Sequence, residues 1–149
     1  MKIKGIKISD RENRILTAEL SDILEEVSNA NSFYWSILSV NGVLNPGKGK
    51  TIFEYENEIN NSKNGLITNV AELKLLSDRF YQMYEVLVLG SRDVSALHRY
   101  KSEEEMYKAC DIVIDQIDCS FWEVYSKDED LIRKLQKKFK KIEMLEVDV

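Results

Sequence analysis

The residues of this chain that could do chemistry are few, and the most suggestive of them lie between Gly90 and Tyr100. His98 is the only histidine, and a histidine titrates near neutral pH, so it could act as a general acid or base. Arg92 and Asp93 follow an apolar segment, in the position where α/β proteins often place ligand contacts. No nucleophile or orienting partner accompanies His98 in the sequence. The pattern therefore favours a locally bonded surface histidine, with a small-molecule-binding or enzymatic loop as the alternative.

A second candidate is the segment Gly47-Lys-Gly-Lys-Thr51, which matches part of a phosphate-binding loop. A loop of that kind ending in Lys50-Thr51 would need a glycine at position 44, which is Leu44. A helix should also follow, to present its N-terminus to phosphate. Thr51 to Tyr55 is instead rich in strand formers, so the sequence predicts a turn followed by a strand and no nucleotide site.

Two sets of carboxylates and two cysteines complete the candidates. The carboxylates that would share a strand face are Asp111 with Asp115, and Glu54 with Glu56 and Glu58. Neither set has the ligand spacing and glycine of a calcium loop. Cys110 and Cys119 lack metal-ligand spacing and an activating neighbour, so they are predicted to be free, buried thiols. We expect no metal, no cofactor and no catalytic residue.

Charge is distributed unevenly along the chain, whose formal net charge is −5. Residues 101–130 hold ten acidic residues against three lysines, whereas residues 131–149 hold six basic residues against three acidic ones. An acidic surface repels nucleic acid and attracts basic partners, although it can also serve solubility alone. The predicted partner-binding residues are Glu54, Tyr55, Glu56, Glu58, Asp111, Asp115, Asp118, Glu123 and Tyr125.

The elements that would position these residues begin with a strand over Lys2–Ile8, where apolar and polar residues alternate. Ser9 and Glu12 predict a capped helix with a stripe ending at Val27. A strand over Phe33–Val40 is followed by Asn41-Gly42, which is a hairpin signal. The strand Thr51–Tyr55 and an irregular polar loop would come next.

The second half predicts further alternation of helix and strand. Asn69 with Glu72, and Ser102 with Glu105, each predict a capped helix. Between these helices, Tyr84–Leu89 is typical of a central strand and is followed by a loop. From Cys110 onward the pattern is strand, turn, strand, a helix capped by Ser126, and a final strand. The chain is therefore expected to be one α+β domain over 1–149, with a mixed, mainly antiparallel sheet packed by about four helices.

Composition fits a globular domain, with 149 residues, 44% hydrophobic and 32% charged. No apolar run is long enough to span a membrane, and Met1–Lys7 lacks the apolar core of a signal peptide. The sequence thus predicts a cytoplasmic protein that binds neither membrane nor nucleic acid.

The segment Asp118-Cys-Ser-Phe-Trp-Glu-Val-Tyr-Ser-Lys-Asp-Glu-Asp-Leu-Ile132, with the apolar strand before it, resembles the C-terminal part of small uncharacterised Bacillus-type bacterial proteins. That resemblance implies an α+β fold and no catalytic residues. In size, acidity and lack of active-site motifs, the chain also resembles immunity proteins of bacterial toxin systems. We therefore expect a non-enzymatic inhibitor that binds a basic toxin or enzyme. A phage-encoded inhibitor of a bacterial defence enzyme is an alternative of the same kind.

Overall fold

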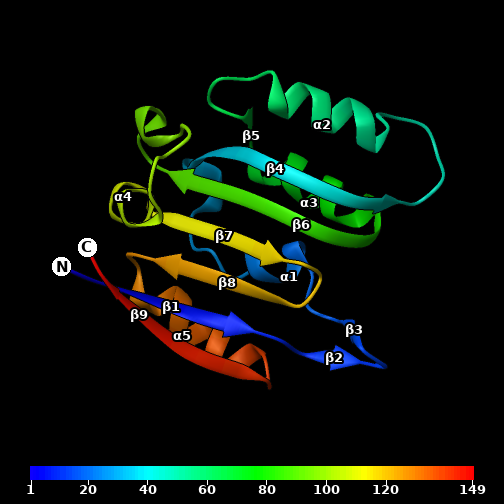
Figure 1. Ribbon diagram of the computed structural model, residues 1–149. Helices are drawn as coiled ribbons and strands as arrows, with labels where there is room; N and C mark the ends of the chain where they lie inside the picture. Colours follow the sequence, from blue (N-terminus) through cyan, green and yellow to red (C-terminus); the bar gives the residue numbers. More distant parts are fainter.

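The computed structural model describes all residues from 1 to 149, in nine strands and five α-helices (Figure 1). The strands are β1 (Lys2–Ile8), β2 (Arg11–Glu12), β3 (Ile15–Leu16), β4 (Tyr34–Leu44), β5 (Leu66–Thr68), β6 (Phe80–Ser91), β7 (Ile112–Ile117), β8 (Phe121–Ser126) and β9 (Ile142–Asp148). The helices are α1 (Leu20–Leu24), α2 (Ile52–Asn60), α3 (Val70–Arg79), α4 (Glu103–Ala109) and α5 (Glu129–Lys138).

Seven of the strands form one sheet in the order β5-β4-β6-β7-β8-β1-β9, and each is antiparallel to its neighbours. The short strands β2 and β3 form a separate hairpin that continues from the end of β1. The predicted α+β class is confirmed, with a sheet that contains no parallel pair and with five helices.

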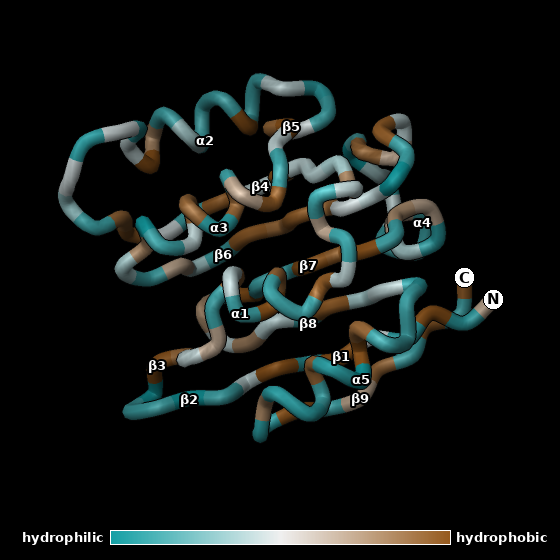
Figure 2. The backbone as a smooth tube through the Cα atoms, turned by 180° about the vertical axis from the view of Figure 1, so that it is seen from behind, coloured by the Kyte–Doolittle hydropathy of each residue, from teal (hydrophilic) through white to brown (hydrophobic).

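Helices cover the two faces of the sheet unequally. α1, α3 and α5 lie on one face, behind the sheet in Figure 1 and in front of it in Figure 2, and their apolar side chains join the main core. α4 packs on the opposite face at one end only, where Met106 and Tyr107 meet Leu89, Val113 and Tyr125. α2 lies along the β4–β5 edge (Figure 1). Much of one sheet face is thus left without a helix.

Two predicted helix starts are confirmed by their capping hydrogen bonds. The side chain of Asn69 accepts a hydrogen bond from the Glu72 N–H at 2.9 Å, and α3 follows directly. Ser102 does the same for Glu105 at 3.2 Å, ahead of α4. Such caps satisfy N–H groups that have no partner inside the helix, which is why they mark helix starts in sequence.

The strand predicted over Thr51–Tyr55 is wrong, because this segment is the start of α2. Thr51 caps the helix by accepting a hydrogen bond from the Glu54 N–H at 3.2 Å. Ile52, Tyr55 and Ile59 stand at positions i, i+3 and i+7, so they form one helical stripe that packs on the main core. The β-forming residue types were outweighed by this longer periodicity.

Three other local predictions also need correction. Ser9 does not cap a helix; the chain forms the β2–β3 hairpin first, and α1 begins later with Glu19 and Asp22 as its capping box. Asn41-Gly42 is not a hairpin turn, since it lies inside β4 at a register shift against β6. α5 is capped by Asp128 instead of Ser126. The Ser126 hydroxyl instead accepts a hydrogen bond from the backbone N–H of the cap residue, Asp128, at 3.0 Å.

Candidate functional site

A row of mainly charged residues crosses the sheet face that α1, α3 and α5 leave uncovered. Five register partners on β6, β7, β8, β1 and β9 make up this row: Leu87, Asp115, Glu123, Lys7 and Glu143. Directly opposed residues of antiparallel strands project to the same face. Alternate residues of the same strands belong to the core beneath the helices. We call these five residues the acidic row.

Asp115 and Glu123 of the acidic row lie in an environment that disfavours their charge. Burial and the neighbouring carboxylate of Glu123 raise the pKa of Asp115 to about 6. Glu103 and Glu85 add to the same shift. The pKa of Glu123 is also raised, by burial and by Glu103, while Lys7 opposes the shift. A further positive charge at this face would therefore be stabilised.

Two stacked tyrosine rings lie at one end of the uncovered face. The ring of Tyr107 on α4 lies 4.2 Å, centroid to centroid, from that of Tyr125 on β8. Gly5 is the register partner of Tyr125, and a Cβ atom there would lie 2.6 Å from the tyrosine ring. Burial raises the pKa of Tyr125 to about 12, so its phenol stays neutral. This end is a small second core, and the acidic row begins beside it.

A groove of about 400 Å³ lies between that small core and the acidic row. Its lining includes Leu87 and Asp115 from the sheet, and Tyr100, Lys101 and Glu103 from the segment leading into α4. The groove combines apolar walls with charged side chains, so the uncovered face is not flat.

An aromatic side chain lies on the opposite side of the acidic row. Phe121 is half-buried on β8, two residues before Glu123, and is the register partner of Ile117 on β7. The Lys7 ammonium lies 4.3 Å from the centre of the Phe121 ring and 4.0 Å from a carboxylate oxygen of Glu143. The single cation of the row is thus already shared between an aromatic ring and one carboxylate.

Three of the predicted partner-binding residues meet on this face. Asp115 and Glu123 are direct cross-strand partners, and Tyr125 is two residues further along β8. Tyr125 is only 7% exposed because Tyr107 covers it. Asp115 and Glu123 are therefore the members of the predicted set that can contact a partner here.

Asp111 and Asp118 lie away from the acidic row, beyond the two ends of β7. A carboxylate oxygen of Asp111 accepts a hydrogen bond from the Arg92 N–H at 2.8 Å. Asp118 is exposed at the β7–β8 turn with φ of 48°. The structure does not bring these two side chains together with Asp115.

The remaining predicted residues lie on a helix instead of a strand, at the far edge of the sheet. These residues are Glu54, Tyr55, Glu56 and Glu58 of α2, which β4 and β6 separate from β7. Glu58 is paired with Lys50, and the Tyr55 hydroxyl lies 3.5 Å from an Arg79 guanidinium nitrogen. The three glutamates thus lie apart from the acidic row, and Tyr55 packs on the main core.

The Gly90–Tyr100 loop does not gather its reactive side chains. Arg92 lies over the Phe33 ring at 5.4 Å, beside a pocket of about 280 Å³. Asp93 caps a short turn through the Ser95 N–H at 3.0 Å. His98 stacks on Tyr100 with ring centres 3.9 Å apart, and lines a different, shallow pocket. Arg92, Asp93 and His98 thus share no pocket.

Arg99, which the sequence did not single out, has the clearest role in this loop. Its guanidinium donates to the Leu38 carbonyl at 3.0 Å and to the Ile59 carbonyl at 2.9 Å. These bonds tie the loop to β4 and to the last turn of α2. The loop is held by structural contacts of a kind that no local sequence motif encodes.

The glycine-lysine segment before Thr51 still does not form a phosphate site, although its surroundings differ from those predicted. A helix does follow Gly49-Lys50-Thr51, contrary to the prediction of a strand. Position 44 is leucine, Lys50 is paired with Glu58, and Glu54 stands in the first turn of α2. An acidic first turn and a neutralised lysine disfavour phosphate.

Both cysteines are free, as the sequence predicts, but only Cys110 is buried, and Cys119 is half-buried. Burial raises the pKa of Cys110 to about 11 and also raises the pKa of the Cys119 thiol. Neither is therefore a thiolate at neutral pH. No group of three or more histidine, cysteine or carboxylate side chains is arranged to hold a metal ion.

Several residues of the acidic row could not be found from the sequence. Lys7 and Glu143 come from opposite ends of the chain and meet Glu123 only because β1 pairs with both β8 and β9. The alternation in Lys2–Ile8 does place Lys7 on a polar face. Nothing in the sequence says which strand lies beside it.

No protein-family model, curated protein or solved structure matches this chain. No helix is long and apolar enough to cross a membrane.

Proposed function

We propose that this protein is a non-enzymatic inhibitor that binds a basic protein, as a bacterial immunity protein binds its toxin, and that the acidic row is its contact surface. The observation that carries the proposal is the cross-strand pair Asp115 and Glu123 on an uncovered sheet face. Burial and neighbouring carboxylates raise the pKa of both groups, so a nearby positive charge would stabilise their ionised forms.

Charge complementarity supports a basic partner. Lys7 is the one basic member of the acidic row, and Glu143 and the Phe121 ring already share it. Lysine or arginine side chains of a partner would relieve the repulsion between Asp115 and Glu123, and Phe121 would add apolar contact beside them. Such an arrangement sets association rate through charge and residence time through aromatic packing.

The test begins with capture of a partner from native-host extracts on the immobilised protein, followed by binding kinetics with that partner. Glu123→Lys should weaken binding by about 10- to 100-fold, because it reverses the charge at the centre of the acidic row. Asp78→Lys is the matched control, since Asp78 is an exposed carboxylate on α3, in the helix layer of the other face. It should bind like the wild type.

Protection of cells against the captured protein gives the biological measurement. His98→Ala should protect as well as the wild type, because this histidine stacks on Tyr100 and has no nucleophile beside it. Loss of protection in His98→Ala with the fold intact, or equal loss in Asp78→Lys and Glu123→Lys, would argue against the proposal. The first result would favour a ligand-binding or enzymatic role for the Gly90–Tyr100 loop.

A further inference from the structure

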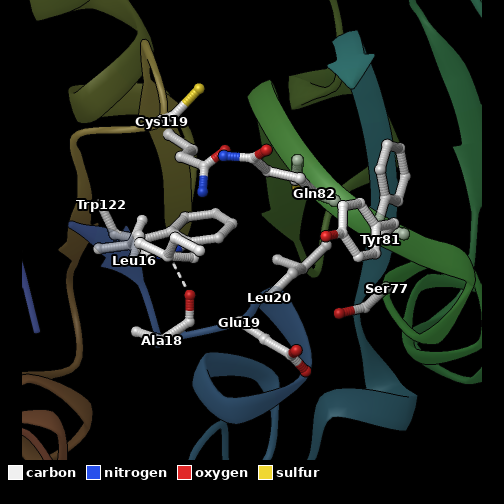
Figure 3. A pocket seen from close by; sticks show the side chains of 13 residues that line it. Leu16, Ala18, Glu19, Leu20, Ser77, Tyr81, Gln82, Cys119 and Trp122 are labelled. Carbon is white, nitrogen blue, oxygen red and sulfur yellow. Dashed lines mark hydrogen bonds between the residues drawn. The ribbon is translucent and has the colours of Figure 1, made fainter. Parts of the chain in front are cut away.

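A small cavity lies within the helix-covered side of the sheet, independent of the acidic row. It has a volume of about 60 Å³ and is bordered by the β2–β3 hairpin, α1, the α3–β6 junction and the β7–β8 turn. Figure 3 shows Trp122 and Leu16 on one side of it and Ser77 and Tyr81 on the other. A water molecule needs about 10–15 Å³ by this measure, so the space exceeds that of one water.

Gln116 is the unusual residue of this cavity. It lies on β7 between its register partners Val86 and Trp122, and is only 3% exposed. Its Oε1 is the one buried side-chain polar atom of the protein that has no hydrogen-bond partner. Buried polar atoms are nearly always paired, because leaving one unpaired forfeits its hydration. The cavity thus presents an acceptor that requires a donor.

Neighbouring protein groups do not supply that donor. The Trp122 indole N–H is committed to the Ala18 carbonyl at 2.8 Å, the bond drawn in Figure 3. The Ser77 hydroxyl accepts from the Ser21 N–H at 3.1 Å and makes no hydrogen bond to Gln116 Oε1. Gln82 brings a second carboxamide to the lining, and its NH₂ group makes no hydrogen bond to Gln116 Oε1 either. Two carboxamides, an indole ring and apolar walls therefore surround the space.

We propose that this cavity binds a small, uncharged molecule carrying a primary carboxamide. A primary amide can donate to Gln116 Oε1 and accept from the Gln116 amide nitrogen, which pairs the two groups reciprocally. Its apolar part would lie against Trp122 and Leu16. An ion would lose its hydration without a buried counter-charge, because Glu19, the one charged residue of the lining, is exposed.

Acetamide is the probe that matches this description, and acetate is its closely isosteric control. In ¹H–¹⁵N spectra of the full chain, acetamide should shift the Trp122 indole and Gln116 side-chain signals saturably. A ligand of so few atoms should have a dissociation constant of about 1 mM. Acetate, at matched ionic strength, should leave these signals unmoved because it offers no N–H donor.

Gln116→Leu keeps the bulk of the side chain and removes the acceptor, and should weaken acetamide binding by roughly tenfold or more. Gln82→Leu should weaken it less. Equal shifts with acetamide and acetate, or shifts that do not saturate, would overturn the proposal without any variant. A crystal soaked in acetamide that shows only an ordered water at Gln116 would overturn it as well.

Discussion

Asp115 gives the acidic row a measurable dependence on pH. Its pKa of about 6 lies above the ordinary value of 3.8, so between these values the folded state binds more protons than the unfolded one. Folding stability is therefore greatest below pH 4 with respect to this group, and decreases as pH rises to about 6. The carboxylate opposes folding at neutral pH.

Asp115→Asn should remove this opposition. We expect the variant to be more stable than the wild type at pH 7, by about 1 kcal/mol after allowing for solvent screening, and no more stable at pH 4. Urea unfolding at both pH values measures the difference. Asp118→Asn, on the exposed turn of the same hairpin, should show no such pH-dependent gain. A loss of stability at pH 7 in Asp115→Asn would show that its charge is compensated in the fold.

One face of α5 is buried and the opposite face is exposed to solvent. Leu131, Ile132 and Leu135 are buried in the main core, and Leu135 is fully buried. Leu135→Ala should therefore destabilise the protein by about 2–5 kcal/mol, through lost burial and the cavity left behind. Lys137 is exposed, so Lys137→Ala should change stability by less than about 0.5 kcal/mol. Comparable losses in denaturant unfolding would mean that α5 packs through another face.

The elements that the sequence predicts correctly are those whose signals are local. Asn69 and Ser102 predict α3 and α4 because a cap needs only residues three positions apart. The strand, turn, strand, helix and strand that follow Cys110 are also found. The prediction for Thr51–Tyr55 is wrong because a short window of β-forming residues hides the helical stripe that reaches Ile59.

Only part of the acidic row could be predicted from the sequence, because some of its residues are brought together by strand pairings between distant segments. Asp115 and Glu123 could be placed on neighbouring strands, because a short turn joins those strands in the sequence. The pairing of β8 with β1 joins segments more than a hundred residues apart, and no local pattern in the sequence indicates it. The buried acceptor of Gln116 depends in the same way on which elements enclose it.

Charge on the protein as a whole should govern its rate of association with a partner. Association with the basic partner proposed here should slow by about tenfold or more between roughly 0.05 and 0.5 M salt, because ions screen the attraction over long distances. The dissociation rate should change little. Stopped-flow mixing over a salt series measures both rates. An association rate that does not change with salt concentration would contradict the electrostatic prediction and leave an apolar interface as the basis of binding.

The two ends of the chain lie side by side at one end of the paired strands β1 and β9 (Figure 1). The Val149 N–H donates to the Met1 carbonyl at 2.8 Å, and the Met1 ammonium donates to the Val149 carbonyl at 3.1 Å. The chain could therefore be given a new start and a new end without changing which strands pair with one another. A circular permutant with these ends joined by a short glycine linker, and reopened in the exposed segment 45–50, should keep the far-UV circular dichroism and cooperative unfolding of the parent. In such a permutant β1 and β9 would be covalent neighbours, and α2 would open the chain.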